Sequence, residues 1–166
     1  MSISMNKQLT DLIEDYDSPF TSSEVHGFFT GLILLKKDNA YYDEKILSFL
    51  DIAPPSLPAC HILMEQLKED IKLNRYKLPI DDMKNFSEAS TSIAEWSYYF
   101  MIAFQETKDV DTDPRIMEIL EVFDEISQVN QKYVIDVNEE VNISSLSEIH
   151  NFIDKSVQYI FNKKND

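Results

Sequence analysis

Glycine is almost absent from this chain: only Gly27 and Gly31 occur among its 166 residues. Average usage of about 7% would supply roughly twelve glycines in a chain of this length. Sheets joined by tight hairpins need several of them, because the favoured two-residue turns require positive φ angles. Helices have no such requirement, and their interiors disfavour glycine. The scarcity of glycine therefore predicts an all-α fold.

Hydrophobic periodicity supports the same fold class and divides the chain into about seven helices in a compact bundle. Apolar residues recur every three or four positions, as in the first segment from Leu9 to Tyr16, which is the spacing of one helix face. Thr/Ser-x-x-Glu capping boxes at 21–24 and 145–148, and the Asp113-Pro114 pair, predict the starts of three helices. Ser56, after two prolines, is expected to cap another helix.

The composition is that of one folded domain covering residues 1–166. Hydrophobic residues make up 43% of the chain, enough for a packed core. The longest strongly apolar stretch, Val25 to Leu35, is about eleven residues, whereas roughly twenty are needed to span a bilayer. We expect a core helix there and no contact with a membrane. A single cysteine, Cys60, and the lack of a signal-peptide pattern after Met1 favour a cytoplasmic location.

The chain is strongly acidic, with 30 acidic residues, 15 basic residues and a formal net charge of −15. Nucleic acids bind proteins mainly through contacts between phosphates and lysine or arginine. A surface with this charge repels phosphates, so direct nucleic-acid binding is not expected.

The two glycines lie four residues apart in one predicted helix. Each costs about 1 kcal/mol relative to alanine in a helix interior, so we expect the fold to gain from them. A spacing of four puts both on one face and leaves a flat strip that another helix backbone can approach closely. The helix around Trp96 and Phe100 is the other segment that is apolar on most sides, and it is the predicted neighbour. A strip that faces a second copy in a homodimer is the alternative.

Three short motifs, in the same order, resemble the YgfB/YecA-like family of bacterial proteins. They are His26-Gly27-x-x-x-Gly31 after the Thr-x-x-Glu cap, Leu78-Pro79-Ile80-Asp81-Asp82, and Ile93-Ala94-Glu95-Trp96 followed by Phe100. The chain differs from the family pattern at Tyr99 and Ala103, where glycines are usual. The resemblance implies an all-α cytoplasmic protein without an established enzymatic activity. It implies the short YgfB-like type, because no cysteine-rich zinc motif follows Cys60.

No recognisable catalytic, cofactor or metal motif stands out. Structural zinc sites use about four cysteine or histidine ligands, and this chain has one cysteine and three scattered histidines. His61 with Glu65, and His150 with Asp154, have the i, i+4 spacing of one helix face and are the candidates for a metal-binding or enzymatic alternative. Surface pairs with this spacing are common, and we favour that interpretation. We expect a buried structural thiol at Cys60, no cofactor and no enzymatic activity.

The sequence therefore favours a non-enzymatic interaction or regulatory protein that binds a protein partner. The segment 106–140 holds eleven acidic and three basic residues. Within it, the predicted helix after Pro114 carries its acids on the side away from its apolar stripe. A solvated, solubilising face is one interpretation of these acids. The sharper hypothesis is a landing site for a basic, nucleic-acid-binding protein, formed by Glu118, Glu121, Asp124 and Glu125.

Overall fold

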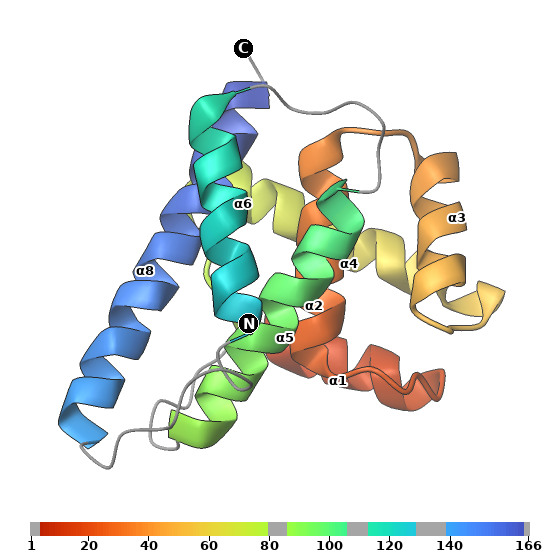
Figure 1. Ribbon diagram of the computed structural model, residues 1–166. Helices are drawn as coiled ribbons and strands as arrows, with labels where there is room; N and C mark the ends of the chain where they lie inside the picture. The colour runs from red at the N-terminus through yellow and green to blue at the C-terminus, as the bar shows by residue number, and fades with distance from the viewer. Residues whose placement is uncertain (1–3, 80–85, 106–112, 129–138, 165–166) are drawn as a thin grey trace.

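The computed structural model describes residues 4–79, 86–105, 113–128 and 139–164, and within these ranges it contains seven α-helices, one 3₁₀ turn and no strand (Figure 1). The helices are α1 (Met5–Asp15), α2 (Ser22–Leu35), α3 (Asn39–Phe49), α4 (Leu57–Lys72), α5 (Phe86–Gln105), α6 (Pro114–Ser127) and α8 (Glu139–Lys164), and the 3₁₀ turn is η1 (Pro54–Ser56). The all-α prediction is confirmed.

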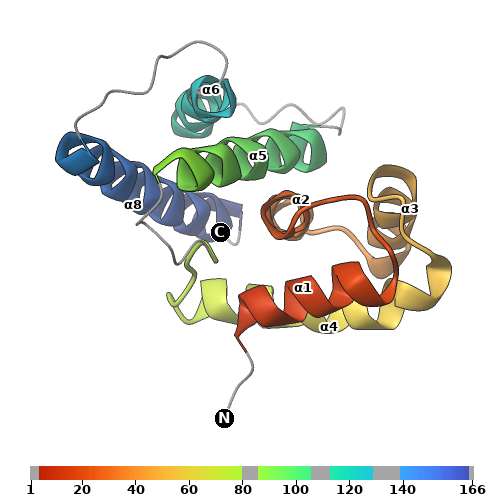
Figure 2. The same cartoon turned by 90° about the horizontal axis from the view of Figure 1, so that it is seen from below.

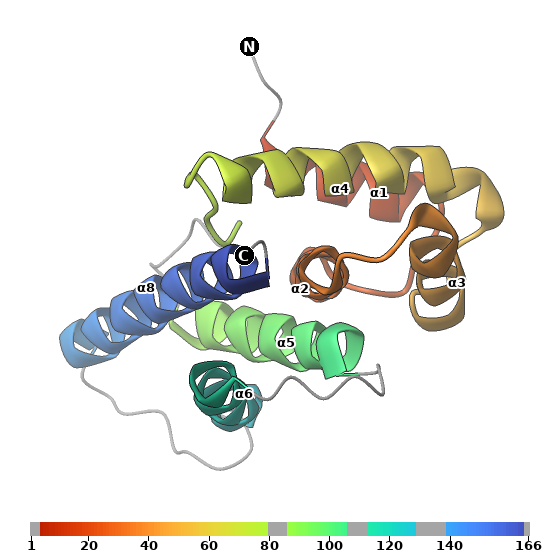
Figure 3. The same ribbon diagram turned by 90° about the horizontal axis from the view of Figure 1, so that it is seen from above.

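Helix α2 occupies the centre of the bundle. Viewed nearly along its axis, it is surrounded by α1, α3, α4, α5 and α8 (Figures 2 and 3). Its apolar residues explain this position, since every residue from Val25 to Leu34 is buried. None of the helices in the described ranges is long and apolar enough to cross a membrane. Helix α6 lies on the far side of α5 from α2, at the edge of the bundle (Figure 2).

A side-chain capping box fixes the start of the central helix α2. The Thr21 hydroxyl accepts a hydrogen bond from the Glu24 amide at 3.2 Å, and the Glu24 carboxylate accepts one from the Thr21 amide at 2.8 Å. This is the predicted capping box, and such a cap is worth about 1 kcal/mol. The Thr21 hydroxyl also donates to the Glu95 carboxylate at 2.8 Å, which ties the start of α2 to α5.

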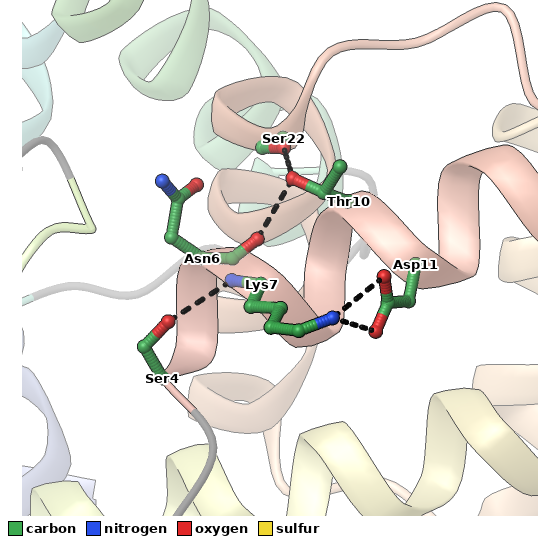
Figure 4. A network of polar contacts seen from close by, with 6 residues as sticks. All are labelled: Ser4, Asn6, Lys7, Thr10, Asp11 and Ser22. Atoms are coloured by element: carbon green, nitrogen blue, oxygen red, sulfur yellow. Dashed lines mark hydrogen bonds and ion pairs between the residues drawn. The ribbon is translucent and has the colours of Figure 1, made fainter.

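Figure 4 shows a further set of polar contacts along α1, which begins after the N-cap Ser4. The Ser4 hydroxyl accepts from the Lys7 amide at 3.2 Å, and the Lys7 ammonium pairs with Asp11 at 3.1 Å. The Thr10 hydroxyl lies 3.4 Å from that of Ser22, at the start of α2. The contact between Thr10 and Ser22 joins the outer helix α1 to the central helix α2, whereas the others stabilise α1 itself.

One predicted helix start is wrong, at Ser145, and the cap predicted at Ser56 is absent although α4 does begin after that residue. Helix α8 begins at Glu139, so Ser145 lies inside a continuous helix and does not begin one. Ser56 makes no capping hydrogen bond, because η1 leads directly into α4 and leaves Ser56 in helical geometry. The Ser56 hydroxyl lies 3.9 Å from the Cys60 sulfur instead.

Candidate functional site

The N-terminal end of α6 is fixed by Asp113, as the Asp-Pro pair predicts. The Asp113 carboxylate accepts hydrogen bonds from the amides of Arg115 at 2.8 Å and Ile116 at 3.1 Å. The same carboxylate lies 3.6 Å from the Lys163 ammonium and 3.5 Å from the Tyr159 hydroxyl. The start of α6 is therefore held both by its own cap and by the C-terminal part of α8.

The inward face of α6 packs through a cluster of aromatic rings. Phe123 is fully buried and meets Trp96 and Phe100 edge to face, with ring centroids 5.7 Å and 5.1 Å apart. It also contacts Phe152 of α8 edge to face, at 6.0 Å. Such geometries add about 0.5–1.5 kcal/mol per pair beyond the burial of apolar area. The cluster holds α6 in a defined orientation on α5.

The outward face of α6 combines carboxylates with apolar side chains. Met117, Glu121 and Glu125 follow one line at i, i+4 and i+8, with Glu118 and Asp124 on its two sides. All four acids are exposed, and Met117, at the N-terminal end of the line, is 49% exposed. The structure thus places the four predicted partner-binding residues together on one accessible surface, which we call the α6 acidic face.

Little within the described part of the chain neutralises the α6 acidic face. Arg115 lies 3.6 Å from the Glu118 carboxylate, and both side chains are more than half exposed. An exposed pair of this kind contributes about 0–1 kcal/mol. Of the seven other acids of the segment 106–140, Asp113 caps α6 and pairs with Lys163. Glu106, Asp109, Asp111 and Asp136 lie outside the described residues, and only the backbone of Glu139 and Glu140 is described.

The two glycines are where α2 and α5 cross. A Cβ atom on Gly27 would overlap the carbonyl oxygen of Trp96, and one on Gly31 would lie 2.7 Å from that of Phe100. It would also lie 2.8 Å from the Cβ of Ala103, so the methyl group of Ala103 already fills the space that a side chain at Gly31 would need. The strip is thus covered within the chain by the predicted helix and is not available to a second copy.

His26 lies in the core beside this crossing and is completely buried. Its Nδ1 accepts a hydrogen bond of 2.9 Å from the Trp96 indole, so the ring proton is on Nε2. Burial lowers the pKa of His26 to about 3, which keeps the ring neutral. Nε2 is buried and has no hydrogen-bond partner among the described residues. The Thr30 hydroxyl donates to the His26 carbonyl at 2.8 Å and lies 2.9 Å from the Tyr76 hydroxyl.

The two histidine–carboxylate pairs differ in their surroundings. The ring of His61 lies 2.5 Å from the carboxylate of Asp43 on α3, a partner that the sequence spacing did not suggest. His150 and Asp154 are half-buried, and burial lowers the pKa of His150 and raises that of Asp154 to about 6. Within the described ranges, no group of three or more histidine, cysteine, aspartate or glutamate side chains could hold a metal ion.

Cys60 is fully buried. Burial raises the pKa of its thiol to about 11, although the contact with the Ser56 hydroxyl acts in the opposite direction. Reactive cysteines have lowered pKa values and partial exposure, so this thiol has the properties of a core residue.

Comparison with known proteins identifies a shared architecture. The structure is similar to the crystal structure of the lpg0076 protein from Legionella pneumophila, with a TM-score of 0.72, 13% sequence identity, and coverage of 97% of this chain and 96% of that chain. At this identity the likeness shows the fold alone. No family model matches the chain, and no curated protein matches its sequence. Function must therefore be argued from the surface itself.

Proposed function

We propose that this protein is a non-enzymatic interaction module that binds a basic segment of a partner protein along the α6 acidic face. The observation that carries the proposal is the exposure of Glu118, Glu121, Asp124 and Glu125 on one helix face that also exposes the apolar side chain of Met117 at its N-terminal end. A purely solubilising face needs only charge. An apolar side chain among the carboxylates adds the buried contact on which the stability of a protein interface depends.

The packing of α6 against the rest of the bundle supports this role. Its inward face is fixed by Phe123 against Trp96 and Phe100, and its N-terminal end by Asp113. The outward side chains therefore stand on a rigid helix at the edge of the bundle. Preorganised surfaces bind with less loss of conformational entropy than mobile ones.

Charge defines the class of partner. The chain carries −15 overall, which disfavours nucleic acids and favours a basic protein, for example one that itself binds nucleic acid. Complementary fields accelerate encounter and exclude partners of the wrong sign. The motif resemblance to the YgfB/YecA-like family fits a binding role without catalysis, and membership of that family is part of the proposal.

The test is a comparison of three baits with the same fold. The first is the parent chain, and the second carries glutamine or asparagine at the four acids of the α6 acidic face. The control neutralises four exposed acids on other helices: Glu14→Gln, Asp15→Asn, Glu44→Gln and Glu69→Gln. After circular dichroism has verified helical content, capture from the source organism is compared by quantitative mass spectrometry.

We expect one basic protein to be enriched by the parent and the control and to be lost from the α6 variant. The two variants have equal net charge, so a difference between them reports the position of the neutralised acids and not the overall charge of the protein. Equal enrichment by all three baits would remove the α6 acidic face as the binding site and leave its acids with a solubilising role.

A further inference from the structure

A hollow of about 690 Å³ opens between the C-terminal end of α2, the start of α3, the middle and C-terminal end of α4, and the C-terminal end of α8. In the view from above, α8 and α3 lie on the two sides of α2, and α4 lies across the third (Figure 3). The volume falls in the range of roughly 300–1,000 Å³ that is typical of small-molecule sites. The hollow shares no residue with the α6 acidic face.

The wall of this hollow has the opposite charge from the rest of the molecule. Four lysines line it, and only two carboxylates do so. The lysines are Lys36, Lys37, Lys68 and Lys72, and the carboxylates are those of Asp38 and Glu65. In a chain with twice as many acids as bases, this is a local reversal of charge. A concave surface with one sign of charge concentrates ligands of the other sign.

Helix α4 supplies half of these cations from a single face. Met64, Lys68 and Lys72 are spaced by four and line the same wall. Lys68 and Lys72 are both exposed and form no ion pair with any other residue that the structure describes, although Glu65 and Glu69 are near them in sequence. Their charge is therefore available to a ligand in the hollow.

The backbone conformation at the end of α2 also favours a role for Lys36 in ligand binding. This residue caps the helix in the left-handed conformation, with φ 55° and ψ 55°. Glycine is usual at such positions, and asparagine and aspartate tolerate them. The other non-glycine residues with positive φ in the described ranges are Asp17, Asp51 and Asn74. Lys36 is thus held in a disfavoured conformation at the rim of the hollow, with its ammonium 5.3 Å from the Phe161 ring centroid.

Apart from Asn39 and His61, the remaining lining is apolar or aromatic. Ile33, Met64 and Phe161 provide apolar surface, and Tyr42 contributes a half-buried ring. A fully solvated inorganic ion gains nothing from such surface, whereas an organic anion with a ring or an alkyl chain does. All four cations are lysines. Lysine binds phosphate as a point charge, and arginine is the residue that matches planar carboxylates in a bidentate manner.

We propose that this hollow binds a small organic phosphate, with the phosphate group among the ammonium groups of Lys36, Lys37, Lys68 and Lys72 and an apolar or aromatic body against Met64 and Phe161. The site is independent of the α6 acidic face, so either proposal can fail without the other. The protein would then carry two binding surfaces of opposite charge, one for a protein and one for a small molecule.

The test uses fragments that separate the two halves of the ligand. Phenyl phosphate, benzoate and inorganic phosphate are each titrated into isotope-labelled protein, and backbone amide shifts are followed by NMR. We expect phenyl phosphate to bind most tightly and to shift amides near Lys36, Tyr42 and Lys68. Binding of inorganic phosphate as tight as that of phenyl phosphate would contradict the role of the apolar lining, and tighter binding of benzoate would contradict the preference for phosphate.

Variants decide whether the lysines carry the binding. Lys68→Gln with Lys72→Gln should weaken binding of phenyl phosphate about tenfold or more. The matched control, Lys77→Gln with Lys155→Gln, removes the same charge from two exposed lysines outside the hollow and should leave the affinity within about twofold. Equal weakening by both pairs, or no shift changes near the hollow with any fragment, would overturn the proposal.

Discussion

Replacement of Gly31 by alanine tests the close crossing of α2 and α5 through the sign of its effect on stability. In a helix with free space around it, this change stabilises the protein by about 1 kcal/mol, because glycine is the poorer helix former. Here the new Cβ would lie 2.7 Å from the Phe100 carbonyl oxygen and 2.8 Å from the Ala103 Cβ. Optimal carbon–carbon separations are about 3.5–4.0 Å, so one helix must move or the contact is strained.

The size of the stability change in Gly31→Ala follows from the balance between overpacking and the gain in helix propensity. Overpacking in a well-packed core costs about 1–3 kcal/mol, and the upper part of that range applies because one obstructing atom belongs to the backbone of α5 and cannot rotate away. After subtraction of the helix-propensity gain, we expect a net loss of about 2 kcal/mol. For a chain of this length that loss corresponds to a melting temperature lower by about 4–8 °C.

The assay is thermal and urea unfolding followed by far-ultraviolet circular dichroism. The double variant Gly31→Ala with Ala103→Gly removes the Ala103 Cβ, one of the two obstructing atoms, so its loss of stability should be smaller than the sum of the two single losses by about 1 kcal/mol. A melting temperature that rises in Gly31→Ala would refute the reasoning, since that is the behaviour of a helix position with free space.

Two further predictions concern buried polar groups. Trp96→Phe removes the indole that donates to His26 and leaves both nitrogens of the His26 ring without a partner among the described residues. Urea unfolding should therefore show that the free energy of unfolding falls by about 1–3 kcal/mol. A fall below about 0.5 kcal/mol would contradict the structural role of this hydrogen bond. Burial raises the pKa of Asp154 to about 6 from an unfolded value of 3.8, so the unfolded state binds fewer protons between these values and stability falls as pH rises through that window. Asp154→Asn should therefore stabilise the protein relative to the parent at pH 7.5 and much less at pH 4, and an equal effect at both pH values would contradict the assigned pKa.

Local signals predicted the fold most successfully. The capping box at Thr21 and the Asp113 cap operate within three residues, so the sequence contains all the groups that form them. The Ser145 pattern shows the limit of this approach, because the same Ser-x-x-Glu spacing fits inside a helix that has already begun at Glu139. Glycine spacing also predicted the crossing with the Trp96 helix, since no other segment combined a comparable apolar surface with a suitable length.

The candidate sites depend on contacts that a single sequence does not record. The exposure of the acids on α6 follows from helix periodicity alone, so the sequence was enough to predict it. The pairing of His61 with Asp43 joins two helices and leaves no pattern along the chain. The lysine-lined hollow forms only where four elements converge. From the sequence alone, Lys68 and Lys72 are simply solvent-exposed residues of α4, because nothing along the chain shows that the ends of α2 and α8 lie beside them.

The central claim is that the α6 acidic face binds a basic partner, and the salt dependence of affinity tests it most directly. Isothermal titration of the captured partner is carried out with the parent, the α6 variant and the equal-charge control at 0.1 M and 1 M salt, over which the Debye length falls from about 10 Å to 3 Å. We predict that the parent and the control bind tightly at low salt and much more weakly at high salt. The α6 variant should bind weakly at both. Parent and α6 variant affinities that agree at low salt would contradict the account.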